Sequence, residues 1–282
     1  MYDPAVPENR GPEAAPQSTL PDDRVEELSY FFPAHDEAEN IEPLVAEALD
    51  VLPTLARRFE IIAVDDGSRD GTAELADRLA AQHPDQVRVV HHVVNLGYGA
   101  ALRSGFGASR YGLVAFTDGD RQFRLADLGP LLRRAEQPVS PTNPTTPDAV
   151  VGYRLKRADH PIRLAYARVY RFCLRLLFGL PVHDVDCACK LFRREALDGV
   201  RLESGGAFLS AELLIKLRAR GRTIVEVGVP HYPRTAGSAS GANPRVVLRA
   251  VRDFWRLRLR LWAQPAATLR RGEPVLGAVP QG

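Results

Sequence analysis

The sequence predicts an α/β protein with a mostly parallel central sheet and helices on both faces. Three observations predict this class: short apolar runs alternate with amphipathic segments, polar clusters follow the apolar runs, and the chain is long enough to bury a large core. It has 282 residues, of which 45% are hydrophobic and 26% are charged.

The first half contains four predicted strands with three helices between them. The strands are apolar runs of strand length, and the helices have apolar positions at helical spacing. The strands are 28–34, 59–66, 87–93 and 112–118, and the helices are 37–52, 70–82 and 99–111. Because the carboxyl ends of parallel strands meet at one edge of a sheet, we expect the loops after these strands to lie together.

The second half is predicted to continue the alternation after an interruption. Residues 137–149 are rich in proline and threonine and predict a mobile loop. The predicted strands after it are 149–154, 188–194 and 222–230, and the predicted helices are 161–178, 209–221 and 244–262.

Four segments are predicted along the chain. Residues 1–27 form a disordered tail rich in proline and acids, without the apolar core of a signal peptide. The main domain covers 28–240, a basic amphipathic helix covers 241–263, and 264–282 form a flexible tail. No apolar run approaches the roughly 18 residues needed to span a bilayer.

The distribution of charge indicates the class of partner, and the cysteine content indicates the cellular compartment. Residues 1–150 carry 13 Lys and Arg against 25 Asp and Glu, whereas residues 151–282 carry 24 against 10, which predicts an anionic partner for the second half. Cys173, Cys187 and Cys189 indicate reduced thiols in a cytosolic protein. Cys187 and Cys189 with His183 match no standard zinc spacing, so we expect ordinary buried thiols there.

Polar clusters follow all four strands of the first half. They are PAHDEAEN (33–40), DDGSRDGT (65–72), NLGYGAALRSG (95–105) and DGDRQF (118–123). At a shared edge of the sheet they could form one site. The glycines of the third cluster are a weak dinucleotide signal, because Leu102 stands where that fingerprint requires its last glycine.

The fourth cluster predicts a metal site. In an extended segment Asp118, Asp120 and Gln122 would point to one side, and their oxygens suit a hard divalent cation such as Mg²⁺, with substrate phosphates completing the shell. The alternative is a solvated acidic turn. We favour the metal because the acids follow a buried strand and join three other polar loops.

The second cluster predicts contacts to a nucleoside. Asp65 and Asp66 directly follow a buried strand, where unpartnered carboxylates are costly, and the base and ribose of a nucleoside offer donors to them. Asp70 has a local explanation, because it can cap the next helix.

Together these ordered motifs resemble family-two nucleotide-sugar glycosyltransferases of the GT-A fold, with the closest likeness to polyprenyl-phosphate (dolichol-phosphate) mannosyl- and glucosyltransferases. The likeness covers about residues 29–240. It implies a Rossmann-like nucleotide-binding half, an acceptor half, and Mg²⁺ or Mn²⁺. The implied reaction is inverting transfer of a hexose from a nucleoside diphosphate sugar (GDP-mannose or a UDP-sugar) to a polyprenyl or dolichyl phosphate.

The resemblance also implies a role for individual residues. The nucleotide-sugar site is expected to contain Pro33, His35, Glu37, Asp65, Asp66, Asn95 and Asp118, the metal ligands are Asp118, Asp120 and Gln122, the catalytic residues are Asp120, Glu212 and Arg234, and the acceptor-phosphate ligands are Arg154, Arg234 and Ser238. Asp184 matches a further acid of the family, whereas His35 and Asp36 replace its usual Tyr-Asn.

Alternatives remain for the acceptor and for the class. A hydroxyl acceptor would need a base, for which Glu212 is the candidate, although Glu212 could instead pair with Lys216 on one helix face. A lipid phosphate is already anionic near neutral pH and needs little help from a base. The other classes are a non-catalytic nucleotide-sugar sensor and an arginine-rich nucleic-acid binder. We expect no nucleic-acid partner, because the acidic loops would then have no role.

The closing helix predicts contact with an anionic membrane. Arg245, Arg249, Arg252, Arg256 and Arg260 form one stripe, while Val247, Val251, Phe254, Leu261 and Trp262 lie elsewhere around the helix. The helix 161–178 carries a similar set, namely Arg163, Arg168, Arg171 and Arg175. This pattern is typical of interfacial helices, and it predicts a peripheral protein on the cytoplasmic face of the membrane. The alternative is two helices packed on the sheet with solvated arginines.

Overall fold

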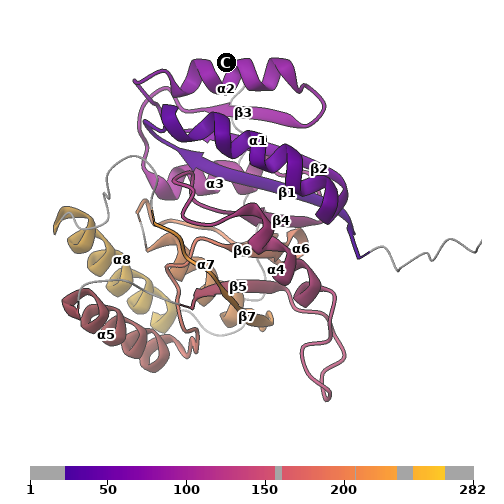
Figure 1. Cartoon of the computed structure of the whole chain (residues 1–282). Coiled ribbons are helices and arrows are strands. Elements are labelled where there is room, and N and C mark those ends of the chain that lie inside the picture. The colour runs from indigo at the N-terminus through magenta and orange to yellow at the C-terminus, as the bar shows by residue number, and fades with distance from the viewer. Residues whose placement is uncertain (1–22, 156–160, 207, 234–243, 264–282) are drawn as a thin grey trace, which may run out of the picture.

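The computed structural model describes residues 23–155, 161–206, 208–233 and 244–263 (Figure 1). Their core is a seven-stranded sheet in the order β3-β2-β1-β4-β6-β5-β7. The strands are β1 (Val25–Ala34), β2 (Ala56–Asp65), β3 (Val87–His91), β4 (Leu113–Phe116), β5 (Ala149–Arg154), β6 (Lys190–Arg193) and β7 (Ile224–Val229).

Most neighbouring strands are parallel, as predicted. The exception is β6, which runs antiparallel to both β4 and β5. Strands β1 to β5 and β7 therefore all end at one edge of the sheet, and β6 begins there. We call this the carboxyl edge.

Helices cover both faces of the sheet. They are α1 (Ala38–Leu55), α2 (Thr72–Gln82), α3 (Tyr98–Ala108), α4 (Leu128–Ala135), α5 (Pro161–Phe178), α6 (Arg194–Leu197), α7 (Leu209–Ala219) and α8 (Pro244–Ala263), with the 3₁₀ turn η1 (Leu125–Asp127). Figure 1 shows α1 in front of the sheet and α3 behind it, with α5 and α8 side by side at one end of the molecule.

The centre of the sheet is buried on both faces, so β1 has a continuous apolar run and no alternation. Phe31 of β1 stacks on Phe116 of β4, with ring centroids 5.3 Å apart, and meets Phe106 of α3 edge-on at 5.0 Å. Phe192 of β6 extends this cluster to Phe106 at 5.6 Å. The aromatic cluster fixes α3 against the strands whose ends carry the polar loops.

Several boundaries differ from the sequence-based prediction. Strand β1 begins at Val25 and not at residue 28, so the predicted tail 1–27 overlaps the sheet. The missed elements are η1, α4 and α6. Gly129 and Pro130 mask α4 in the sequence, but both lie in its first turn, where proline is tolerated. Segment 137–149 folds back on itself, with the Val139 N–H 2.8 Å from the Thr145 carbonyl.

We expect Gly105→Ala to destabilise the protein. A Cβ at this position of α3 would overlap the ring of Phe31, which is fully buried and held by the aromatic cluster. Overpacking of this kind costs about 1–3 kcal/mol, which exceeds the gain in helix propensity. Gly112→Ala is the matched control, because its Cβ would meet nothing within 4 Å. Equal urea midpoints for the two variants would contradict this account.

Candidate active site at the carboxyl edge

The loops after β1 and β2 are joined by backbone-to-side-chain hydrogen bonds. The Asp36 N–H donates to Ser68 Oγ at 3.0 Å, and Asp36 Oδ1 accepts the Arg69 N–H at 2.8 Å. The Glu37 N–H donates to Thr72 Oγ1 at 2.9 Å. The first two polar clusters are therefore one structural unit.

Asp70 stabilises the same junction. Its carboxylate accepts the Thr72 N–H at 3.1 Å and also the Ala38 N–H at 3.1 Å. The N-cap residue of α2, however, is Gly71, without a side-chain cap. Burial alone would raise the pKa of Asp70, but the hydrogen bonds from Thr72 and Ala38 lower it. The predicted cap role is therefore wrong, because Asp70 precedes the cap residue, and what Asp70 does is fix the start of α1 beside α2.

Asp66 joins the loops after β2 and β3. Its buried carboxylate accepts the N–H groups of Leu96 and Gly97 at 2.9 and 2.8 Å. His92 Nδ1 lies 2.6 Å from the same carboxylate, and His92 Nε2 lies 2.8 Å from Ser104 Oγ. Asp66 therefore sets the backbone path of the loop that leads into α3.

Asp65 is held in a similar way, by Ser68 and by His91 at the end of the neighbouring strand β3. It accepts the Ser68 N–H at 3.1 Å and lies 3.1 Å from His91 Nδ1, while His91 Nε2 lies 2.9 Å from Asp77. Burial alone would raise the pKa of Asp65, but hydrogen bonds from Ser68 and His91 lower it. Burial alone would lower the pKa of His91, but Asp77 and Asp65 raise it.

The Asp-Gly-Asp turn after β4 is tied to the other loops. Tyr98, at the start of α3, donates from its hydroxyl to Asp118 Oδ1 at 2.9 Å. A Cβ on Gly119 would lie 2.6 Å from the carbonyl oxygen of Pro33, so the turn needs glycine to pack against the end of β1. Asp120 Oδ1 accepts the Gln122 N–H at 3.1 Å. The predicted convergence of the four loops is confirmed.

Gln122 connects this turn to the segment after β7. The Tyr232 N–H donates to the Gln122 carbonyl at 3.0 Å, and Gln122 Nε2 lies 3.4 Å from the Tyr232 carbonyl. Tyr232 leads toward Arg234 and Ser238, which lie outside the described residues.

Arg154 comes to the same edge at the end of β5. Its Nε and Nη2 donate to the two oxygens of Asp184 at 2.6 and 2.9 Å, a buried bidentate pair. Burial alone would lower the pKa of Arg154, but Asp184 raises it. The arginine predicted to bind an acceptor phosphate is therefore held in one orientation and stays charged.

Lys190 is a buried amine at this edge that the sequence did not single out. It is the first residue of β6 and lies opposite Phe116. Its Nζ donates to the Cys187 carbonyl and lies 5.5 Å from the centroid of the Phe116 ring. Burial lowers the pKa of Lys190, opposed by nearby groups that include Asp118. Burial raises the pKa of Cys187 to about 12, as expected for an ordinary buried thiol.

Glu212 of α7 has a structural role. Its buried carboxylate accepts the N–H groups of Glu203 and Ser204 at 2.9 and 2.8 Å. The alternative pairing with Lys216 is confirmed at 2.6 Å. Glu212 thus holds residues 203–204, and the adjoining Gly205 carbonyl accepts the Gly99 N–H at the start of α3, at 3.3 Å.

The remaining predicted site residues occupy the same edge. Pro33 lies near the end of β1, and His35 and Glu37 are in the loop that follows it. Asn95 is exposed in the loop after β3, and its backbone lies against Gly67. Within the described part of the chain, no group of three or more His, Cys, Asp or Glu side chains could hold a metal.

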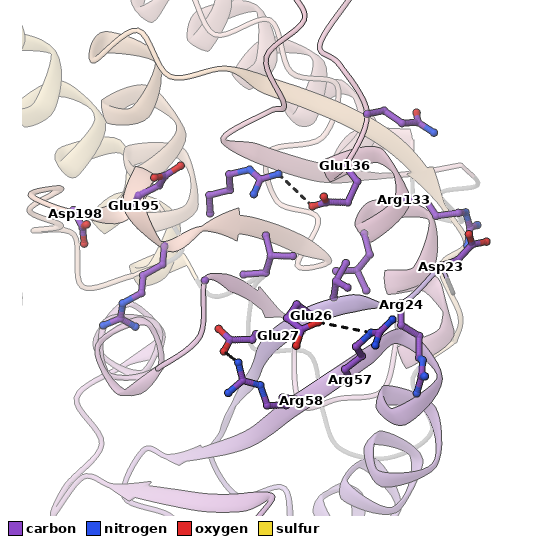
Figure 2. Close-up of a pocket in the computed structure, with 17 residues that line it drawn as sticks. Asp23, Arg24, Glu26, Glu27, Arg57, Arg58, Arg133, Glu136, Glu195 and Asp198 are labelled. Carbon is purple, nitrogen blue, oxygen red and sulfur yellow. Dashed lines mark hydrogen bonds and ion pairs between the residues drawn. The ribbon is translucent and has the colours of Figure 1, made fainter. Parts of the chain in front are cut away.

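A cavity of about 1090 Å³ lies at the opposite edge of the sheet (Figure 2). Several of its charged lining groups pair with one another, as in Arg57 with Glu26 at 3.7 Å and Arg193 with Glu136 at 3.2 Å. None of the predicted site residues lines it. We therefore place the candidate site at the carboxyl edge, where the polar loops meet, and not in this cavity.

We expect the ion pairs of His91 to make stability depend on pH. The pKa of His91 in the folded protein is raised above its unfolded value of about 6.5, so its contribution is present below that pH and is lost as pH rises through the folded pKa. The advantage of the wild type over His91→Asn in urea midpoint should shrink from pH 5.5 to pH 8.5. A difference that stays constant or grows with pH would contradict this.

The control for that experiment is His83→Asn. His83 directly follows α2. Unlike His91, its ring forms no ion pair with a carboxylate of the described residues. The difference between this variant and the wild type should show no comparable decline over the same range of pH.

Residues 29–201 match the family model described as glycosyl transferase family 2. The chain is 31% identical to glycosyltransferase AglD of Haloferax volcanii over 83% of its own length but only 38% of that protein. It is 30% identical to polyprenol monophosphomannose synthase of Mycolicibacterium smegmatis, covering 82% of this chain and 87% of that one. It is also 30% identical to undecaprenyl-phosphate 4-deoxy-4-formamido-L-arabinose transferase of Pseudomonas paraeruginosa, covering 78% and 62%.

Solved structures agree in fold. Mannosyl-3-phosphoglycerate synthase from Rubrobacter xylanophilus superposes with a TM-score of 0.59 at 20% identity, over 86% of this chain and 80% of that one. Glucosyl-3-phosphoglycerate synthase from Mycobacterium tuberculosis, solved with Mn²⁺ and UDP-glucose, gives a TM-score of 0.56 at 20% identity, over 81% and 78%. The chain belongs to glycosyl transferase family 2 and has the α/β GT-A fold.

Proposed function

We propose that this protein transfers a hexose, with inversion, from a nucleoside diphosphate sugar to a polyprenyl phosphate, using Mg²⁺ or Mn²⁺. The observation that carries the proposal is the linked set of loops around Asp118 and Asp120 at the carboxyl edge. Two relatives support the class of acceptor, because one is a polyprenol monophosphomannose synthase and the other is an undecaprenyl-phosphate sugar transferase.

The donor's nucleoside would occupy the loops after β1, β2 and β3. Asp65 accepts hydrogen bonds from the nucleoside, and Asp66 contributes chiefly by holding the backbone of Leu96 and Gly97. Pro33, His35, Glu37 and Asn95 complete this part of the site. The solved relative with bound UDP-glucose supports a nucleotide-sugar donor without deciding between GDP-mannose and a UDP-sugar.

The residues at the Asp-Gly-Asp turn fit a divalent cation. Carboxylate and amide oxygens of Asp118, Asp120 and Gln122 are hard ligands, and a hard cation commonly takes its other ligands from substrate phosphates. The Tyr98 hydroxyl orients Asp118, and the Gln122 N–H orients Asp120. A bound cation would supply Lewis-acid stabilisation of the charge that develops on the departing diphosphate.

The acceptor phosphate would lie beside Arg154. A phosphate monoester has a second pKa near 6, so it is a nucleophile at neutral pH without a protein base. It needs cations that position it, and Asp184 fixes the guanidinium of Arg154 in one orientation. Arg234 and Ser238 are assigned to the same phosphate by the family resemblance alone.

The geometry favours this acceptor over a hydroxyl. A hydroxyl requires a base that can reach its proton, and the candidate for that base is Glu212. Its buried carboxylate is occupied by two backbone N–H groups and by Lys216.

Because the lipid acceptor is dissolved in a bilayer, we place the protein at the cytoplasmic face of the membrane. In the described part of the chain no helix is both long and apolar enough to cross one.

We expect one nucleotide sugar to raise the thermal midpoint in the presence of Mn²⁺. The panel is GDP-mannose, UDP-glucose and UDP-GlcNAc. At about 100 Kd the stabilisation is about 2.7 kcal/mol, which corresponds to roughly 5–10 °C for a domain of this size. Mass spectrometry should then detect the hexosyl phosphate product with polyprenyl phosphate, and no product with a simple alcohol.

Asp120→Asn should abolish both the metal-dependent shift and turnover while keeping the fold. Asp85→Asn, the same change at an exposed acid before β3 and away from the carboxyl edge, is the matched control and should change neither. A shift without product would indicate a sensor. Product with the alcohol, lost in Glu212→Gln, would favour the hydroxyl acceptor. The absence of any shift would overturn the proposal.

A further inference from the structure

Helix α8 has one buried face. Phe254 and Leu257 lie there, and Phe254 meets Tyr170 and Phe178 of α5 at ring-centroid distances of 6.5 and 5.0 Å. Phe208, just before α7, lies 5.9 Å from the same ring. Phe254 therefore anchors α8 to the body of the protein. The sequence pattern had grouped Phe254 with Val251 and Trp262, but those two residues are exposed and Phe254 is buried.

A second face of α8 is apolar and exposed. We call it the apolar stripe. Its members and their exposed fractions are Leu248 (72%), Val251 (49%), Trp255 (52%), Leu259 (59%) and Trp262 (77%). At about 100° per residue these five positions fall within an arc of roughly 80°. Large apolar side chains in one contiguous row are uncommon on the free surface of a soluble protein and mark a contact surface.

Helix α5 repeats the arrangement beside α8. Val169, Phe172 and Leu176 are 62%, 64% and 68% exposed and lie on one side of the helix. Figure 1 shows the two helices side by side, which agrees with the contacts of Phe254. The exposed apolar residues are thus concentrated at one end of the molecule.

Arginines border these apolar residues. On α8 they are Arg249, Arg252, Arg256 and Arg260 along one side of the stripe and Arg258 along the other, and on α5 they are Arg168, Arg171 and Arg175. The sequence of α5 contains no acid, and that of α8 contains only Asp253, which is buried and lies 3.4 Å from Arg252. The surface is therefore apolar along its ridge and cationic at its borders.

We propose that this surface docks the protein on an anionic lipid bilayer, with the apolar stripe of α8 inserted at the level of the headgroups. Long arginine side chains can reach headgroup phosphates beside an inserted apolar ridge, and tryptophan favours the interface. A second copy of the chain is a poorer occupant, because it would bring an equally arginine-rich surface against this one. The inference deepens the membrane placement made in the proposed function by assigning the docking surface, and it can be tested apart from the reaction, since docking requires neither donor nor acceptor.

Docking would also bring the bilayer close to the candidate site. Arg260 of α8 pairs with Glu203, and the loop 203–206 that contains Glu203 contacts the start of α3 through Gly99 and Gly205. The same α3 start carries Tyr98, which binds Asp118. Helix α8 is therefore connected to the Asp-Gly-Asp turn through three successive contacts.

The experiment uses the two tryptophans of the chain as reporters, because both belong to the apolar stripe. The full-length protein is mixed with vesicles of phosphatidylcholine alone or with about one third phosphatidylglycerol. We expect co-sedimentation and a blue shift of tryptophan fluorescence with the anionic vesicles. Both should be weaker with phosphatidylcholine alone and at high salt.

Two double variants test the apolar and cationic parts separately. Leu248→Ser with Leu259→Ser keeps both reporters, and Arg168→Glu with Arg249→Glu reverses charges at the border. Each should weaken vesicle binding by at least about 10-fold without lowering the thermal midpoint, because all four side chains are exposed. Arg78→Glu with Arg133→Glu makes the same charge change on exposed positions of α2 and α4 and should bind like the wild type.

Three outcomes would overturn the proposal. The first is no sedimentation with anionic vesicles, and the second is sedimentation without a blue shift, which would indicate charge attraction with the stripe left in water. The third is a blue shift without vesicles that grows with protein concentration, together with a doubled mass, which would assign the stripe to self-association. Because neither donor nor metal is present, failure here leaves the proposed reaction untouched.

Discussion

The site depends on one buried carboxylate, that of Asp66. A carboxylate at the end of a buried strand is costly unless donors surround it, and this one accepts the N–H groups of Leu96 and Gly97 and contacts His92. These bonds fix the chain just before Tyr98, whose hydroxyl in turn holds Asp118. The acidic turn that we assign to the metal is therefore positioned by an acid that directly follows another strand, β2.

In the acceptor half, buried carboxylates again hold neighbouring groups in place. Asp184 orients Arg154, and Glu212 orients the backbone of residues 203–204. Losing one partner of a buried ion pair such as Arg154 with Asp184 costs about 3–5 kcal/mol. These acids therefore fix the structure around the site even where they do not touch a substrate. Loop 203–206 then joins this frame to α3 on one side and to α8 on the other.

The order of elements and the polar edge could be predicted from sequence because both depend on local patterns. Apolar runs alternate with helical periodicity, and Asp65, Asp66, Asp118 and Asp120 directly follow such runs. Other features depend on tertiary contacts. The antiparallel direction of β6 leaves no local signal, and the structural role of Glu212 requires the position of residues 203–204. Which apolar residues of α8 face outward depends on where Phe254 packs.

The most direct test of the central claim, that Asp118 and Asp120 hold a divalent cation with the donor's diphosphate, is electron paramagnetic resonance of Mn²⁺ titrated into the protein. The account predicts that UDP or GDP causes one Mn²⁺ per chain to bind, that the bound ion shows coupling to phosphorus, and that Asp118→Asn loses this signal while staying folded. Unchanged binding and phosphorus coupling in Asp118→Asn would contradict it.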